Sequence, residues 1–202
     1  MRVFLAIDVT SKVRRQIAGL QESLRKHGVK AKWIRPQACH LTVLFLGDQE
    51  KDGLDKFSQY LALRFASFRS FKMQQGEIGT FGRPPRILYM RWDPIPDDSF
   101  DRLVDTARDN AGLAALPLPE SASRKKNVPH LTLARFKSPR DAKTLRKIGR
   151  RDRGQWRWTC QFPAIPPGAR EIVVDHLTLY ASTLTREGAV YEVIQKFPLA
   201  TV

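Results

Sequence analysis

Residues that build metal centres and disulfides are scarce in this sequence. The 202 residues include only two cysteines, Cys39 and Cys160, and four histidines. The cysteines stand far apart and form no metal-type or disulfide-framework spacing, which disfavours a disulfide-stapled secreted domain. A zinc site is disfavoured as well, because it needs about four suitably spaced ligands. We therefore expect a reduced, cytoplasmic protein that uses no metal and no other cofactor.

Long apolar runs are also missing, since none approaches the ~20 residues that a membrane-spanning helix requires. The first residues lack the layout of a signal peptide, and the apolar run at residues 3–7 instead predicts a strand. Hydrophobic residues make up 42% of the chain, which is ordinary for a globular protein with a core. We expect one bilobal domain over residues 1–202 that acts as a monomer and away from membranes.

Acidic residues are the third deficit. The sequence has 20 Asp and Glu against 35 Lys and Arg, a formal net charge of +15, which favours a polyanionic partner such as nucleic acid. Basic residues gather at 124–126 and at 143–153, and Trp156 and Trp158 follow the second cluster. Basic and aromatic residues together suit single-stranded RNA, although a solvated face explains any single lysine equally well. We name Lys125 and Lys126 as candidate RNA-binding residues, because their cluster leads into His130.

The apolar pattern predicts an α+β protein with many strands. Apolar residues at helical spacing, Val13, Ile17, Leu20 and Leu24, predict a helix over residues 11–26. The order strand, helix, strand occurs over residues 3–46 and again over 87–136, and we interpret this echo as two pseudo-symmetric lobes. The further elements expected are helices at 54–68, 100–113 and 141–148, a Gly/Pro-rich loop at 79–85, and strands at 40–46, 71–78, 87–92, 130–136, 156–162, 171–180 and 189–197.

One short motif occurs on two of the expected strands. His40-Leu41-Thr42 and His130-Leu131-Thr132 stand 90 residues apart, and side chains at i and i+2 share one face of a strand. If the two strands meet, two imidazoles and two hydroxyls converge. Histidines of unlike protonation state can act as general acid and general base, and hydroxyls can hold phosphate oxygens. A lone histidine is more often a core residue satisfied by the backbone, but the repetition favours catalysis.

The motifs and their flanking residues resemble the two-histidine (2H) phosphoesterase superfamily. Within it, the sequence is similar to the LigT-like RNA 2′,3′-cyclic phosphodiesterases of bacteria and archaea, also called 2′-5′ RNA ligases. The resemblance runs in order over nearly the whole chain. It is carried by Arg2 to Asp8, Trp33 to Pro36, Phe45 to Gly47, Phe81 to Leu88, Pro129 to Arg135, Leu179 to Ser182 and Tyr191 to Leu199. It implies two α+β lobes with antiparallel sheets, whose motifs face a central cleft.

The resemblance also implies an enzyme and its chemistry. RNA ending in a 2′,3′-cyclic phosphate, such as a tRNA fragment, is hydrolysed to a 2′-phosphomonoester without metal. His40 donates a proton to the 3′ oxygen and His130 accepts one from water, while Thr42 and Thr132 hold the phosphate. Run backwards with a ribose 5′-hydroxyl in place of water, the same site forms a 2′-5′ linkage without ATP.

Phe45 and Arg135 each follow their motif histidine by five residues. The resemblance implies that both face the nucleotide. Strict alternation would place them on the face opposite the histidines, so a β-bulge or a strong twist must re-aim them. The alternative is a core phenylalanine and a surface arginine.

A third copy, His176-Leu177-Thr178, lies in a late strand outside the catalytic pair that the resemblance implies. We assign His176 no catalytic role. Two alternative functions stay open: a basic RNA-binding module whose histidines are structural, and a 2H phosphodiesterase that acts on another small cyclic nucleotide. The first would bind RNA without turnover.

Overall fold

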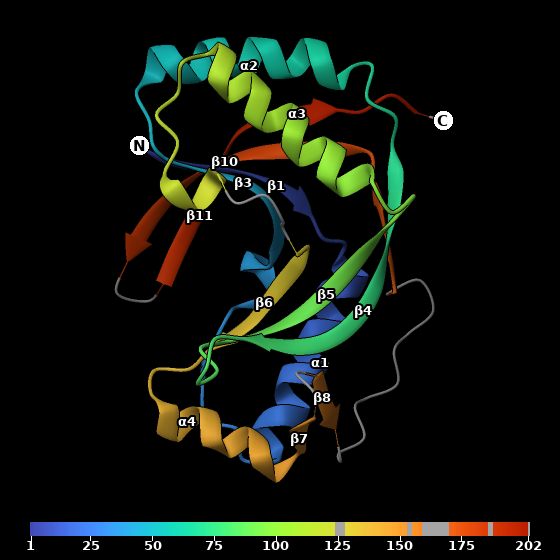
Figure 1. Cartoon of the computed structure of the whole chain (residues 1–202), viewed down its shortest axis with the longest axis vertical. Coiled ribbons are helices and arrows are strands. Elements are labelled where there is room, and N and C mark those ends of the chain that lie inside the picture. Colours follow the sequence, from blue (N-terminus) through green and yellow to red (C-terminus); the bar gives the residue numbers. More distant parts are fainter. Residues whose placement is uncertain (124–127, 153–154, 159–169, 186–187, 202) are drawn as a thin grey trace.

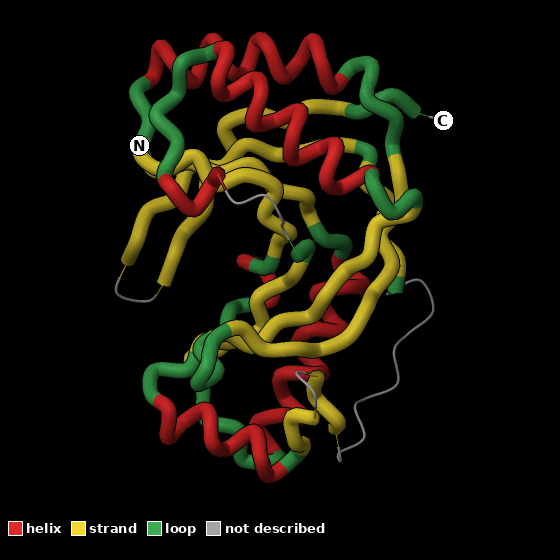
Figure 2. Tube along the Cα trace, in the orientation of Figure 1, coloured by secondary structure: helices red, strands yellow, loops and turns green. Residues whose placement is uncertain are grey.

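The computed structural model describes residues 1–123, 128–152, 155–158, 170–185 and 188–201. Within these residues the strands form two larger antiparallel sheets and a small hairpin, with helices on the outer faces (Figure 1). Figure 2 shows the strands of both larger sheets curving strongly along their length. The expected α+β class with two antiparallel lobes is confirmed. None of the described helices is long and apolar enough to cross a membrane.

The first sheet contains the first motif at its edge. Its strand order is β11-β10-β1-β3 and every pair is antiparallel. The bounds are Arg2–Asp8 for β1, His40–Asp48 for β3, His176–Thr185 for β10 and Gly188–Pro198 for β11.

The second sheet contains the second motif, on a strand one position in from its edge. Its order is β2-β6-β5-β4-β9, again antiparallel throughout. The bounds are Lys32–Trp33 for β2, Phe71–Phe81 for β4, Ile87–Ile95 for β5, His130–Arg135 for β6 and Glu171–Val174 for β9. A separate hairpin pairs β7 (Gly149–Asp152) with β8 (Gln155–Trp158).

The helices are exchanged between the two halves of the chain. Helix α1 (Ser11–Lys26) follows β1 of the first sheet, yet it packs on the second sheet (Figure 1). There Gln16 hydrogen-bonds Gln75 of β4 at 2.6 Å, and Gln21 reaches the Leu133 carbonyl of β6 at 3.0 Å. Helix α3 (Ser99–Leu113) follows β5 of the second sheet but contacts β3 and α2 (Lys51–Phe65) over the first. The order strand, helix, motif strand is thus present in both halves, but each helix packs on the sheet of the other half.

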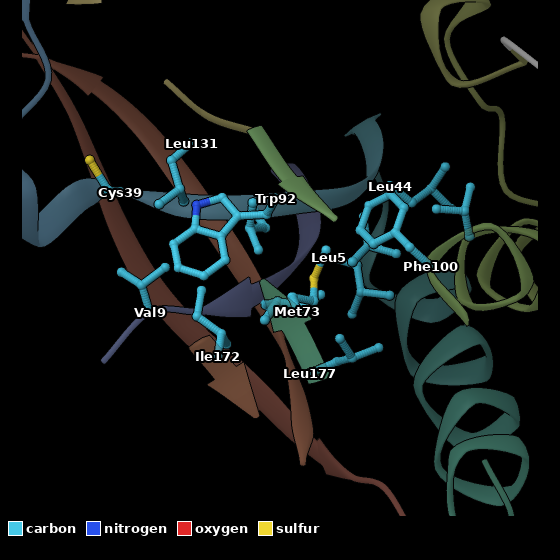
Figure 3. Packing of buried hydrophobic residues seen from close by; sticks show 14 of the residues in the cluster. Leu5, Val9, Cys39, Leu44, Met73, Trp92, Phe100, Leu131, Ile172 and Leu177 are labelled. Carbon is cyan, nitrogen blue, oxygen red and sulfur yellow. The ribbon is translucent and has the colours of Figure 1, made fainter. Parts of the chain in front are cut away.

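One continuous hydrophobic core joins the two sheets. Buried side chains from both sheets and from the helices belong to a single cluster. Figure 3 shows Leu5 and Leu177 of the first sheet near Met73 and Trp92 of the second, with Phe100 of α3 beside them. This shared core fixes the two sheets, and with them the two motifs, relative to each other.

The predicted strand at 171–180 is wrong, because the structure divides it at Asp175. Strand β9 pairs with β4 in the second sheet, whereas β10 pairs with β1 in the first. Burial follows the division: Ile172 and Val174 are buried at even positions, and Leu177 and Leu179 at odd positions. The alternation changes phase at Asp175, where the chain crosses from one sheet to the other.

Other boundaries differ from expectation by a few residues. Helix α2 begins three residues early, β4 continues into the expected loop, and the helix expected at 141–148 is a short α4 (Pro139–Lys143) followed by a 3₁₀ turn, Thr144–Lys147. The sequence pattern did not predict β2 or β7. The strand expected at 156–162 is described only to Trp158, and the rest lies outside the described residues.

Candidate active site

The two motifs begin strands that meet at the junction of the sheets. His40 is the first residue of β3, and His130 is the first residue of β6. The strands contact each other, and the Cys39 thiol beside His40 lies 3.7 Å from the Thr132 carbonyl oxygen. The rings also interact electrostatically, because the charge of His130 lowers the pKa of His40. The two motif histidines are therefore close enough to interact, as the expected meeting of the strands requires.

Both imidazoles are held in the same way. Nδ1 of His40 lies 3.0 Å from the carbonyl oxygen of Ala38, and Nδ1 of His130 lies 2.8 Å from that of Val128. A carbonyl oxygen only accepts, so each Nδ1 carries a hydrogen and each neutral ring has its lone pair on Nε2. No described residue hydrogen-bonds either Nε2. Each Nε2 can therefore take up or give a proton, as acid–base catalysis requires.

A β-bulge follows each motif at the same offset. The pairing of β1 with β3 passes from Leu44 to Thr42, and that of β5 with β6 passes from Ala134 to Thr132. Val43 and Leu133, three residues after their histidines, are skipped. A bulge residue inverts the alternation beyond it, so Phe45 and Arg135 return to the histidine side.

The lining of a cavity of about 600 Å³ shows that Phe45 and Arg135 lie on the same side as His40. His40, Thr42, Phe45 and Arg135 line it together, so the alternative of a core Phe45 does not hold. His130 and Thr132 do not line it. Sequence reasoning assigned no binding role to several basic or aromatic residues of its wall, although most of them lie in segments that carry the family resemblance. They are Arg2, Lys32, Trp33, Arg35 and Tyr191. The guanidinium carbon of Arg2 lies 4.8 Å from the centre of the Phe45 ring.

Aromatic rings fix the plane of each imidazole. Phe4 stacks on His40 with ring centroids 4.6 Å apart, and Tyr191 meets the same ring edge-on at 5.1 Å. Phe81 meets His130 edge-on at 4.8 Å, and Tyr89 does so at 5.6 Å. Packing of this kind restricts ring rotation and holds Nε2 in one direction.

Burial favours the neutral form of both histidines. It lowers the pKa of His40 to about 4; the hydrogen bond to Ala38 and the charge of Asp8 oppose this shift, while His130 adds to it. Burial also lowers the pKa of His130, and the charge of Arg135 adds to that shift. Both imidazoles therefore favour the neutral form, and each needs negative charge nearby to hold a proton.

The third His-Leu-Thr copy lies in β10 and surrounds Asp8 of β1. His176 Nε2 lies 3.3 Å from the carboxylate, Thr178 Oγ1 donates to it at 2.9 Å, and the Tyr180 hydroxyl donates to it at 2.5 Å. Asp8 is itself the cross-strand partner of His40. Sequence reasoning did not single out Asp8, although polar side chains at every second position of β10 signal a shared partner on one face.

The basic cluster at 143–153 surrounds a second cavity, of about 490 Å³. Its wall includes Trp156, Pro84 and Pro85, and its basic residues are Lys143, Arg146, Arg150 and Arg151. Trp156 donates from Nε1 to the Thr80 hydroxyl at 2.9 Å and stacks on Trp158 with centroids 5.0 Å apart. Lys125 and Lys126, the other candidate RNA contacts, lie outside the described residues.

Tyr89 lies near both His130 and the basic residue Arg151. Burial raises the pKa of Tyr89, and the charge of Arg151 acts against that shift, so the arginine lies near a ring that packs on His130. In the described part of the chain, no three His, Cys, Asp or Glu side chains are grouped to hold a metal ion. Metal independence stays a prediction.

Comparison with known proteins agrees with this geometry. Residues 7–89 match the family described as LigT like Phosphoesterase. A Methanocaldococcus jannaschii protein named RNA 2′,3′-cyclic phosphodiesterase is 30% identical over 98% of this chain and 100% of its own length. A Thermotoga maritima protein of the same name is 29% identical over 96% and 93%. A solved Thermus thermophilus structure, 24% identical, shares the fold with a TM-score of 0.69 over 100% and 99% of the two chains.

Proposed function

This chain belongs to the LigT-like phosphoesterase family, and from this premise we propose that it hydrolyses RNA 2′,3′-cyclic phosphate ends to 2′-phosphomonoesters. The observation that carries the proposal is the matched pair of His40 and His130. Their Nδ1 atoms are tied to backbone carbonyls in the same way, and their Nε2 atoms are left for a ligand. The relatives' shared name supports the choice of substrate, and the cytoplasm is the compartment that we propose.

In the proposed reaction, His130 acts as the base and His40 as the acid. Nε2 of neutral His130 takes a proton from water as its oxygen attacks phosphorus. The bond from phosphorus to the 3′ oxygen breaks, and Nε2–H of protonated His40 gives its proton to that oxygen. A ribose 3′-hydroxyl and a 2′-phosphate result. With a ribose 5′-hydroxyl attacking phosphorus in place of water, the same proton transfers form a 2′-5′ phosphodiester and again free the 3′-hydroxyl.

Polar groups beside the pair hold the phosphate. The Thr42 and Thr132 hydroxyls donate hydrogen bonds to the phosphoryl oxygens, and the Arg135 guanidinium stabilises the charge that builds on them. Phe45 offers a face for the terminal base. Thr42, Phe45 and Arg135 share one cavity wall, which supports this arrangement. A bound phosphate also supplies the negative charge that His40 needs to carry its proton.

We further propose that the cavity of about 490 Å³ receives the RNA body. Lys143, Arg146 and Arg150 are exposed on its rim and would attract backbone phosphates, while Trp156 provides an aromatic surface for a base. The position of Arg151 near Tyr89 supports a path from this cavity to the second motif. A chain of several nucleotides would span both sites, whereas a cyclic mononucleotide would fill only the first.

The test uses a short oligonucleotide that ends in a 2′,3′-cyclic phosphate, followed by identification of the product isomer. The proposal expects the 2′-phosphomonoester and a lower KM than for the matching cyclic mononucleotide. Binding without turnover would favour a structural role for the histidines. Equal kcat/KM for the two substrates would favour an enzyme for small cyclic nucleotides.

A further inference from the structure

The third His-Leu-Thr copy holds one carboxylate rather than a substrate. His176, Thr178 and Tyr180 occupy alternate positions of β10, and all three reach Asp8 of the neighbouring strand β1. Lys196 of β11 adds its ammonium group 3.6 Å from the same carboxylate. Two side chains of β10 donate to this one carboxylate, and the imidazole of a third lies within hydrogen-bonding reach.

These contacts keep Asp8 ionised in a partly buried position. Burial alone raises the pKa of Asp8, but the hydrogen bonds from Tyr180, Thr178 and His176, together with the charge of Lys196, lower it below its usual value. Its side chain is only 20% exposed. A partly buried carboxylate must be paired or hydrogen-bonded, and these four partners meet that need while they keep the charge on Asp8.

Asp8 acts on His40. The two residues are direct cross-strand partners, and the charge of Asp8 raises the pKa of His40 against the effect of burial. Phe4, from the same strand as Asp8, connects the two clusters by stacking on the His40 ring at 4.6 Å and on the Tyr180 ring at 5.3 Å.

The other charged groups near His40 have the opposite sign. His130 faces it from β6, and the charged residues of the cavity wall are all basic: Arg2, Lys32, Arg35 and Arg135. Two phenols, Tyr180 and Tyr191, also face the ring and are neutral at ordinary pH, because burial raises the pKa of each. The charge of His130 disfavours a proton on His40, and the charge of Asp8 opposes that effect.

We propose that Asp8 is a positioning residue that stabilises the protonated imidazole of His40, with the His176-Leu177-Thr178 strand as its support. This role rests on the proposed function, in which His40 is the proton donor. A phosphate that binds in the cavity then completes the charge balance that Asp8 begins. The third motif copy therefore supports the proton donor indirectly: it contacts Asp8, and Asp8 acts on His40.

NMR titration of the imidazoles tests the coupling without any turnover. The chain has only four histidines, so single substitutions assign every signal. The titration compares wild type with Asp8→Asn, each with and without saturating inorganic phosphate. Asp48→Asn is the matched control, because Asp48 ends the same β1–β3 ladder opposite Arg2, at the end far from His40. We expect Asp8→Asn to lower the pKa of His40 by about 1 unit and Asp48→Asn to leave it unchanged. An unchanged His40 in Asp8→Asn would overturn the proposal.

The pH profile of hydrolysis provides the kinetic readout. Loss of Asp8 makes His40 a stronger acid that is protonated only at lower pH, so the alkaline limb of kcat should move toward acid pH. A merely structural Asp8 would lower the rate equally at every pH and leave the limbs in place. Lys196→Ala, which removes the exposed cation beside the carboxylate, should strengthen the effect of Asp8 and move the limb the opposite way, toward alkaline pH, and it keeps the test decisive if Asp8→Asn does not fold. Absence of wild-type turnover would refute the proposed function alone, because the titration is still measurable.

Discussion

At the scale of single residues, the account depends on two histidines whose environments match. His40 and His130 share a carbonyl partner at the same sequence offset and aromatic rings on the flanks. The motif itself could be recognised in the sequence, because a strand does not need a histidine followed two positions later by a threonine, and the chain repeats this pattern. The aromatic neighbours could not be predicted, since Phe4 and Tyr191 reach His40 only through strand pairing.

Substitution of either histidine should abolish most of the activity. His40→Ala and His130→Ala should each lower kcat by ~10²–10⁴-fold, the range for a lost proton-transfer group. His27→Ala is the matched control, because His27 caps the end of α1 and its ring lies against the Ser23 carbonyl of the same helix. His176→Ala should cost less than either active-site change, since it only weakens the hold on Asp8. A loss from His176→Ala as severe as that from His40→Ala would show that the wrong pair was chosen.

The pH dependence should differ between free and bound enzyme. Burial lowers the pKa of both histidines, so kcat/KM, which reports the free enzyme, should be greatest below about pH 6.5 and fall as pH rises and the acid loses its proton. The negative charge of bound phosphate raises the pKa of both histidines, so the pH optimum of kcat should be higher than that of kcat/KM. The limbs belong to the coupled pair and do not by themselves assign either residue. A flat profile between about pH 5 and 9 would contradict two-histidine catalysis.

At the scale of elements, the paired bulges decide which side chains enter the site. Phe45 and Arg135 could be predicted as candidates from their shared offset, but alternation placed them on the wrong face. A bulge is a property of two strands in register, so one strand's sequence does not reveal it. The division at Asp175 was not predicted either, because three successive apolar residues before it, Ile172 to Val174, hide the alternation that the structure shows. Helices α1 and α3 each pack on the sheet of the other half because the two sheets share one core. The spacing of apolar residues within a helix does not indicate which sheet the helix will cover.

A side-chain hydrogen bond from helix α1 stabilises the bulge at Leu133 of β6, and a substitution can remove it. The carbonyl of Leu133 accepts hydrogen bonds from the Ile34 amide at 3.0 Å and from Gln21 of α1 at 3.0 Å, and Gln21 is buried. Gln21→Met keeps the length of the side chain and removes the donor. We expect the free energy of unfolding to fall by ~1–3 kcal/mol and KM to rise through a loosened Arg135.

Denaturant melts and steady-state kinetics together measure this effect. Gln16→Met on the same helix is the control, because its partner is Gln75 of β4 rather than the bulge. An equal rise of KM in both variants would mean that α1 stabilises the sheet in general and has no particular effect on the bulge.

At the scale of the whole molecule, the charge of +15 exceeds what one terminal phosphate needs. Composition alone predicted a polyanionic partner, and the structure gathers part of this charge around a cavity beside Trp156. The position of this cavity could not be predicted, because it depends on how the β7–β8 hairpin lies against β4. Figure 1 shows this hairpin beside α4, at the end of the molecule opposite α2.

Salt dependence separates RNA capture from chemistry. Affinity for a single-stranded oligonucleotide should fall by about 0.7 log units per log unit of salt for each phosphate engaged, whereas a cyclic mononucleotide should respond weakly. The double variant Arg146→Glu/Arg150→Glu should raise KM for the oligonucleotide and leave kcat on the mononucleotide within a few-fold.

The control for this variant is Arg64→Glu/Arg69→Glu, which reverses the same charge near the C-terminal end of α2, in another cavity wall. Equal salt slopes for the two substrates would mean that the basic surface is only a solvated face.

The central claim is metal-independent acid–base catalysis by His40 and His130, and one measurement addresses it most directly. Hydrolysis of a 2′,3′-cyclic nucleotide is followed after exhaustive chelation, with the metal content of the protein verified and the product isomer identified. The account predicts an unchanged rate and a 2′-phosphomonoester, because two imidazoles and the phosphate-binding groups supply all the proton transfers and charge that the reaction needs. Loss of activity on chelation, with recovery when a divalent ion is restored, would contradict it.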